Sequence, residues 1–170
     1  MSRTAKKQSP SSLYEADFHA WTQSQSRAIA ERRWSDVDAA NVADEIGSLG
    51  FELEREIADR LEILMSYLLK WRHLAEYRGL AWKENIDRQR QELGDLFAEN
   101  PSLSGGRERC AAAAYEHARK RLKYETYFFV TDFPASCPFT AEQVFDSKYF
   151  PEELDAPASG KFPTARSIGR

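Results

Sequence analysis

Apolar side chains recur at gaps of three or four residues between positions 42 and 71, and this repeat constrains the fold more than any other feature. The members are Val42, Ile46, Leu49, Leu53, Ile57, Leu61, Leu64, Leu68 and Trp71. Because an α-helix has 3.6 residues per turn, this spacing places them on one face of a single helix of about eight turns. Gly47 and Gly50 interrupt the repeat at a cost of about 1 kcal/mol each, which indicates a kink or the close approach of another helix.

Similar spacing predicts three further helices, over residues 13–33, 80–99 and 107–129. In the first we expect four inward-facing side chains: Tyr14, Phe18, Trp21 and Ile29. Ser35 is expected to cap the long helix that follows. The helix over 80–99 should end at Asn100, because a residue before proline avoids the helical conformation.

We therefore predict an all-α fold: a bundle of about four main helices with one long second helix and an irregular proline-rich C-terminal wrap. Within this wrap one short helix should open near Thr140, which supplies an N-cap signal. Residues 12–154 are expected to form a single helical domain. The polar segments 1–11 and 155–170 have the composition of disordered tails.

Composition argues against attraction of the whole chain to nucleic acid or to a membrane. The net charge is −3, so no global attraction to nucleic acid or to anionic lipid is expected. No apolar run approaches the ~18 residues that a membrane span needs, and the basic N-terminus lacks the apolar centre of a signal peptide. The two cysteines, Cys110 and Cys137, fit no metal or redox spacing. We expect a cytoplasmic protein with reduced thiols and no membrane association.

The length of the apolar stripe favours a partner. Eight turns extend roughly 45 Å, whereas a compact domain of this size has a radius of gyration near ~15 Å. Part of the stripe is therefore expected to pack against a second copy of the chain or against another protein.

A cluster of aromatic and basic residues occurs where the long helix should end and the next begin. Its members are Lys70, Trp71, Tyr77, Arg78 and Trp82. Two indoles and a phenol at a helix corner could stack on a base or a cationic ligand. The alternative, which we favour, is that they fill a corner of the core while the basic groups neutralise helix C-terminal carbonyls.

A second candidate is a buried polar network. Glu45 lies on or beside the apolar stripe, and Gln89 falls where the spacing of the 80–99 helix requires an apolar residue. Because a buried polar side chain needs a partner, we expect Glu45 to meet Arg88 or Arg90 with Gln89 inside the network. We interpret this contact as structural rather than catalytic.

The third candidate is the basic run "ARKRLK" in the last long helix, which offers Arg119, Lys120, Arg121 and Lys123 as phosphate contacts. Its charges point around the helix rather than along one stripe. Residues 36–71 hold nine acidic and three basic residues. A complementary pairing of acidic and basic helices is therefore the favoured interpretation.

Catalytic and metal-binding patterns have little support. His19, His73 and His117 fall on three different expected helices, and no two share the spacing of a helical metal site. The chain has no GxSxG or phosphate-binding glycine loop, and Cys137 has no evident histidine partner. We expect no cofactor and no bound metal, and the sequence offers no set of residues that favours an enzymatic activity.

Several motifs in order resemble DUF29, a family of bacterial proteins of unknown function. They are "YEADFHAW", "VADEIGSLG", "LEILMSYLLKW", "AWKENIDRQRQEL", "NPSL" and "FPASCPFTAEQVFD". The resemblance implies an all-helical fold but no established activity, substrate or cofactor. In many relatives a histidine is expected just before "LLKW", where this chain has Tyr67, and this difference counts against a catalytic role.

Two functions follow as hypotheses. The first is a protein-interaction or self-association module that uses the apolar stripe. The second is a nucleic-acid-binding or RNA-processing factor that uses the basic helix. An enzyme has the least support.

Overall fold

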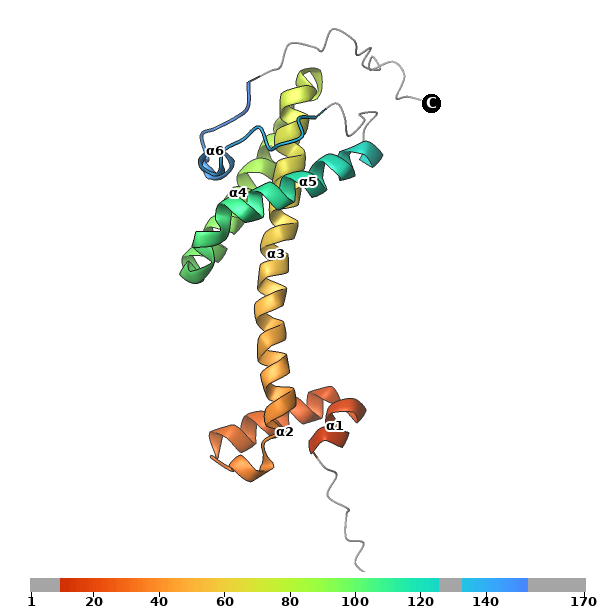
Figure 1. Cartoon of the computed structure of the whole chain (residues 1–170), viewed down its shortest axis with the longest axis vertical. Helices are drawn as coiled ribbons and strands as arrows, with labels where there is room; N and C mark the ends of the chain where they lie inside the picture. The colour runs from red at the N-terminus through yellow and green to blue at the C-terminus, as the bar shows by residue number, and fades with distance from the viewer. Residues whose placement is uncertain (1–9, 126–132, 153–170) are drawn as a thin grey trace, which may run out of the picture. The chain divides into compact units, whose positions relative to one another are not determined.

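The computed structural model describes residues 10–125 and 133–152, and within these ranges the regular structure is helical, with no strand (Figure 1). The all-α prediction is confirmed. The chain divides into two compact units, residues 1–54 and 55–170. Residues 10 and 11 of the expected N-terminal tail begin a helix. The rest of the predicted tails, 1–9 and 155–170, lies outside the described residues.

The N-terminal unit begins with two helices where the sequence predicted one. Helix α1 spans Pro10–Ala16 and α2 spans Phe18–Ala30. Asp17 separates them with φ −155°, and its carboxylate accepts a hydrogen bond from the Ala20 N–H at 2.9 Å. An aspartate in this position is an N-cap, which satisfies a free N–H of the first turn and so starts a new helix.

The buried face of α2 consists of Trp21, Gln25 and Ala28. The Trp21 ring packs edge-on against Tyr14 of α1, with ring centroids 4.8 Å apart. The predictions that Phe18 and Ile29 face inward were wrong, since both side chains are exposed. Ile29 follows Trp21 by eight residues, which rotates it about 80° away from the buried face.

A short connection leads from α2 to the long helix α3, which spans Ala39–His73. It contains Arg32 with a positive φ of 57° and the 3-10 turn η1, Trp34–Asp36. The expected capping role of Ser35 was wrong, because Ser35 lies inside this turn. The buried Gln25 side chain instead accepts a hydrogen bond from the Asp38 N–H at 2.7 Å, immediately before α3 begins.

The core of the C-terminal unit forms between the C-terminal turns of α3 and two further helices (Figure 1). Helix α4 spans Leu80–Glu99, the predicted bounds, and α5 spans Arg107–Glu125. The 3-10 turns η2, Ala75–Tyr77, and η3, Pro101–Gly106, connect them. The predicted extension of α5 to residue 129 lies outside the described part of the chain. Fully buried side chains of this core include Leu61, Leu64, Leu68, Ile86, Leu93 and Leu122.

The C-terminal segment, residues 133–152, covers this core as the predicted irregular wrap. It contains one short helix, α6, Ala141–Phe145. Thr140 caps α6 reciprocally with Gln143: the Thr140 hydroxyl accepts from the Gln143 N–H, and the Gln143 side chain accepts from the Thr140 N–H. Phe133, Phe139 and Val144 insert into the core.

Arg90 of α4 attaches this segment to the helices. Its side chain donates hydrogen bonds to the carbonyls of Val144 at 2.8 Å, Tyr149 at 2.8 Å and Gln143 at 3.1 Å. Arg90 is 5% exposed, and burial lowers the pKa of its guanidinium. Its charge is retained because arginine does not lose its proton in proteins. One buried guanidinium thus satisfies three main-chain carbonyls of a segment with little regular structure.

Replacing Arg90 with methionine should lower the free energy of unfolding by about 3 kcal/mol or more, because three carbonyls lose their donor. Arg88→Met is the matched control, since Arg88 is exposed and donates to Asn85 on the same helix. We expect the control to change stability by less than about 0.5 kcal/mol. Urea unfolding followed by circular dichroism measures both variants, and equal losses would contradict this role of Arg90.

Candidate functional site

The N-terminal turns of α3 present an apolar face on which two side chains are exposed and two are half-buried. We define the N-terminal apolar face as Val42, Ile46, Leu49 and Leu53. Ile46 is 65% exposed and Leu49 is 66% exposed, whereas the same stripe is buried from Ile57 to Leu68. Single exposed apolar residues are common, but contiguous ones indicate an interaction surface.

Other large apolar side chains of the N-terminal unit are exposed as well. Among the residues that the structure describes in this unit, the exposed large apolar side chains are Phe18, Ile29, Trp34, Ile46, Leu49 and Phe51. The C-terminal unit is about twice as long, yet its described residues contribute only Leu80 and Tyr124 to this class. The exposure of apolar surface is therefore concentrated in the N-terminal unit.

The two glycines of α3 lie in open space. A Cβ atom added at Gly47 or at Gly50 would meet nothing within 4 Å. Helix α3 continues through both positions without a break. The close approach that the sequence suggested is therefore not made within the described residues of the N-terminal unit, where both glycines are exposed.

Acidic residues border the N-terminal apolar face. Glu45 accepts a hydrogen bond from the Tyr14 hydroxyl, and this bond raises the pKa of Tyr14. Glu52 and Glu54 are exposed. Between Ala39 and Glu54 the helix contains acidic side chains but no lysine or arginine.

The members of the predicted polar network have separate partners. Glu45 belongs to the N-terminal unit and is bound by Tyr14, whereas Arg90 belongs to the C-terminal unit and binds main-chain carbonyls. Arg88 is exposed and donates to Asn85. Gln89 is buried, and its Oε1 atom has no hydrogen-bond partner among the described residues. Sequence reasoning singled out Arg90 but missed its carbonyl partners.

The aromatic and basic corner is half-buried at all five positions: Lys70, Trp71, Tyr77, Arg78 and Trp82. The Trp71 ring packs on Phe150 with centroids 4.9 Å apart, and the Arg78 guanidinium lies 5.5 Å from the centroid of the Trp71 ring. Arg78 also donates to the Trp71 carbonyl at 2.7 Å. Lys70 lies 5.0 Å from the Tyr67 ring. These contacts support the structural interpretation, in which a basic side chain satisfies a carbonyl at the end of α3.

Two arginines of the basic run contact carboxylates. Arg119 bonds Glu116 of the same helix at 3.0 Å and donates to the Pro134 carbonyl at 3.2 Å. Arg121 lies 3.5 Å from Glu62 of α3. Lys120 and Lys123 are exposed. The contact between Arg121 and Glu62 is of the kind that complementary acidic and basic helices would make.

The histidines and cysteines form no metal site within the described residues, where no group of three or more metal-ligating side chains comes together. His117 lies 3.7 Å from Glu62, and the His73 ring packs edge-on against Phe133. Burial raises the pKa of Cys137, whose thiol donates to the Phe139 carbonyl at 3.3 Å. A raised thiol pKa lowers the fraction of reactive thiolate. None of the described helices is both long and apolar enough to cross a membrane.

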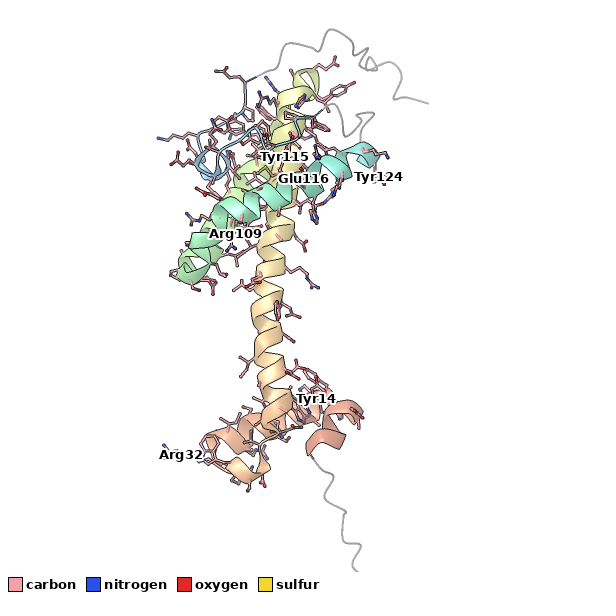
Figure 2. All side chains as sticks on the ribbon, in the orientation of Figure 1. Tyr14, Arg32, Arg109, Tyr115, Glu116 and Tyr124 are labelled. Carbon is pink, nitrogen blue, oxygen red and sulfur yellow. The ribbon has the colours of Figure 1, made fainter. Side chains whose placement is uncertain are left out.

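Tyr115 of α5 connects that helix to the C-terminal segment. Its side chain is 1% exposed, and its hydroxyl donates to the Pro134 carbonyl at 2.7 Å. Figure 2 shows Tyr115 beside Glu116 on α5. Burial raises the pKa of Tyr115 to about 12. The sequence offered no signal for this contact beyond the apolar spacing of the helix.

The raised pKa of Tyr115 predicts a loss of stability at alkaline pH. The unfolded chain ionises this phenol near pH ~10, and the folded chain only near 12. The stabilisation is therefore complete below about pH 10 and is lost as the pH rises toward 12, by about 2 kcal/mol. Urea unfolding across this range should show a smaller loss in Tyr115→Phe, and equal losses in both proteins would exclude Tyr115 as the source.

Comparisons with known proteins give a family but no function. Neither the search of curated proteins nor the search of solved structures found a match. The family model described as "Domain of unknown function DUF29" matches residues 13–150, which extend from α1 to the C-terminal segment. This match includes most of the chain and agrees with the resemblance seen in the motifs. The chain therefore belongs to the DUF29 family.

Proposed function

We propose that this protein is an interaction module of the bacterial cytoplasm that binds a protein partner, or a second copy of itself, through the N-terminal apolar face. The observation that supports the proposal is the exposure of Ile46 and Leu49 at 65% and 66% on a continuous helical stripe. Covering both side chains would stabilise a complex by roughly 2–4 kcal/mol. Val42 and Leu53 would add to this contribution.

Among the residues that the structure describes, the exposed part of the stripe is confined to its N-terminal half. The C-terminal half of the same repeat is buried in a well-packed core, so the spacing is of the kind that this chain uses to pack helices. An apolar helix face in water gains free energy when another helix covers it. The face therefore has the composition and the accessibility of a helix-binding surface.

Nucleic-acid binding through α5 is the second candidate. Lys120 and Lys123 are exposed and available to phosphates. Arg119 and Arg121, however, are engaged by Glu116 and Glu62, and phosphate binding would have to compete with these carboxylates. The apolar face gives the first candidate the stronger support.

The proposal predicts the behaviour of a double variant, Ile46→Ser/Leu49→Ser. A tagged chain recovered from its native cells should retain a protein partner after nuclease treatment. The amount of that partner recovered with the double variant should be at least about 10-fold lower. The matched control is Phe51→Ser/Leu80→Ser, which removes two side chains that are 73% and 70% exposed at other places. Phe51 is rotated about 140° from Ile46 on α3.

All variants should retain their helical circular dichroism, since exposed substitutions change stability little. Sedimentation velocity of the purified chain identifies self-association in the same set of variants. A partner that is lost equally in the control, or that depends on nucleic acid, would contradict the proposal.

A salt titration tests the second candidate. The interaction proposal expects no saturable binding of a short fluorescent RNA at about 50 or about 200 mM salt. Phosphate binding through the four basic residues of the run would instead appear as affinity that falls roughly 50-fold to 150-fold over this range. If such binding disappeared in Lys120→Glu/Lys123→Glu, nucleic-acid recognition would replace the interaction module.

A further inference from the structure

The surface around the N-terminal apolar face is anionic. The described residues of the N-terminal unit include nine carboxylates: Glu15, Asp17, Glu31, Asp36, Asp38, Asp44, Glu45, Glu52 and Glu54. The same residues include three arginines, of which Arg33 is paired with Glu31 and Asp36. A binding surface of one sign attracts partners of the opposite sign and repels others.

The carboxylates of α3 lie at both borders of the apolar face. At about 100° per residue, the four apolar side chains fall within an arc of about 60°. On one side of this arc, Glu45 and Glu52 lie within about 60° of its edge. On the other side, Glu54 lies about 80° from the edge. An acidic border on each side of an apolar stripe is matched by a helix whose own apolar stripe has basic borders.

Around the axis of α3, the surface between the N-terminal apolar face and Glu54 has small side chains. Ala39, Ala43 and Gly50 lie there, and all three are exposed. Space beside Gly50 is open, since an added Cβ atom would meet nothing within 4 Å. Small residues beside large apolar ones let the ridge of a second helix enter closely. The shape as well as the charge of the surface therefore fits a helix.

A second copy of the chain fits this surface poorly. A symmetric pairing of two such faces would place Glu45, Glu52 and Glu54 of one copy near the same carboxylates of the other. Like charges brought together across an interface cost free energy and disfavour that partner. Lysine or arginine at the borders of the partner would instead pair with these carboxylates.

We infer that the occupant of the N-terminal apolar face is an amphipathic helix of another protein, with an apolar stripe bordered by lysine or arginine. This inference rests on the proposed function and specifies its partner. The apolar stripe provides affinity, and the borders distinguish a basic helix from an acidic one and accelerate association.

Two designed peptides test the inference directly. Both have the same leucine and alanine stripe at helical spacing, and one has lysine at its borders where the other has glutamate. Fluorescence anisotropy of each labelled peptide, titrated with the full chain, should show saturable binding of the lysine peptide. We expect its affinity to exceed that of the glutamate peptide at least about 10-fold, which corresponds to about 1.4 kcal/mol.

Variants assign the binding to this face. Ile46→Ser/Leu49→Ser should lower the affinity for the lysine peptide at least about 10-fold. Glu52→Gln/Glu54→Gln should lower this affinity roughly 3-fold to 10-fold. The matched control Glu84→Gln/Glu99→Gln removes the same charge from exposed positions of α4. The control should bind the lysine peptide as the unmodified chain does.

The remaining outcomes overturn the inference in distinguishable ways. Equal affinity for both peptides, lost in Ile46→Ser/Leu49→Ser, would exclude the preference for a basic partner but would still support the interaction module. Dimerisation through the same face would identify a second copy as the occupant and also leave the module. Absence of saturable binding would exclude the basic helix. Equal weakening in the two glutamine variants would indicate general charge attraction. Failure of the proposed function itself is measured separately by the native-cell recovery.

Discussion

The buried guanidinium of Arg90 is the interaction on which the C-terminal unit depends. The segment that it binds has prolines at 134, 138 and 151 and one short helix, so few of its carbonyls have partners in regular structure. A buried carbonyl without a donor costs free energy comparable to a lost hydrogen bond. The planar fork of arginine donates in several directions at once, which a lysine ammonium on a flexible stem does less well. Tyr115 adds a similar connection from α5 to the carbonyl of Pro134. Together these two side chains explain how a segment of irregular backbone closes a helical core.

The elements with strong local signals were predictable from the sequence. Helix α4 has the predicted bounds because Asn100-Pro101 stops it and an apolar repeat defines its buried face. The short helix α6 was predicted from the capping residues near Thr140. The division at Asp17 was missed because aspartate is tolerated within an apolar repeat, and its capping role appears only in its contact with Ala20. The partners of Arg90 were not predictable, since main-chain carbonyls 53 to 59 residues away have no residue-type signature.

The apolar stripe illustrates the same limit at the candidate site. Spacing predicted one long helical face, and the structure has one long helix. Spacing does not indicate which turns are covered, because coverage depends on where other helices pack. The division of the stripe between Leu53 and Ile57 is therefore a tertiary property. The acidic borders, in contrast, are visible in the sequence once the exposed half of the stripe is known.

The open surroundings of Gly47 and Gly50 have a consequence for the local stability of α3. Each glycine weakens the helix by about 1 kcal/mol relative to alanine, and a Cβ atom added at either position would meet none of the described residues within 4 Å. The amides of these turns rely mainly on hydrogen bonds within the helix, whereas those from Ile57 onward are protected by a packed core. Opening of α3 should therefore begin near the glycines, and their amides should exchange with solvent before those of the core. A helix docked on this face would slow that exchange, so the exchange rates of the α3 amides would report whether the surface is occupied.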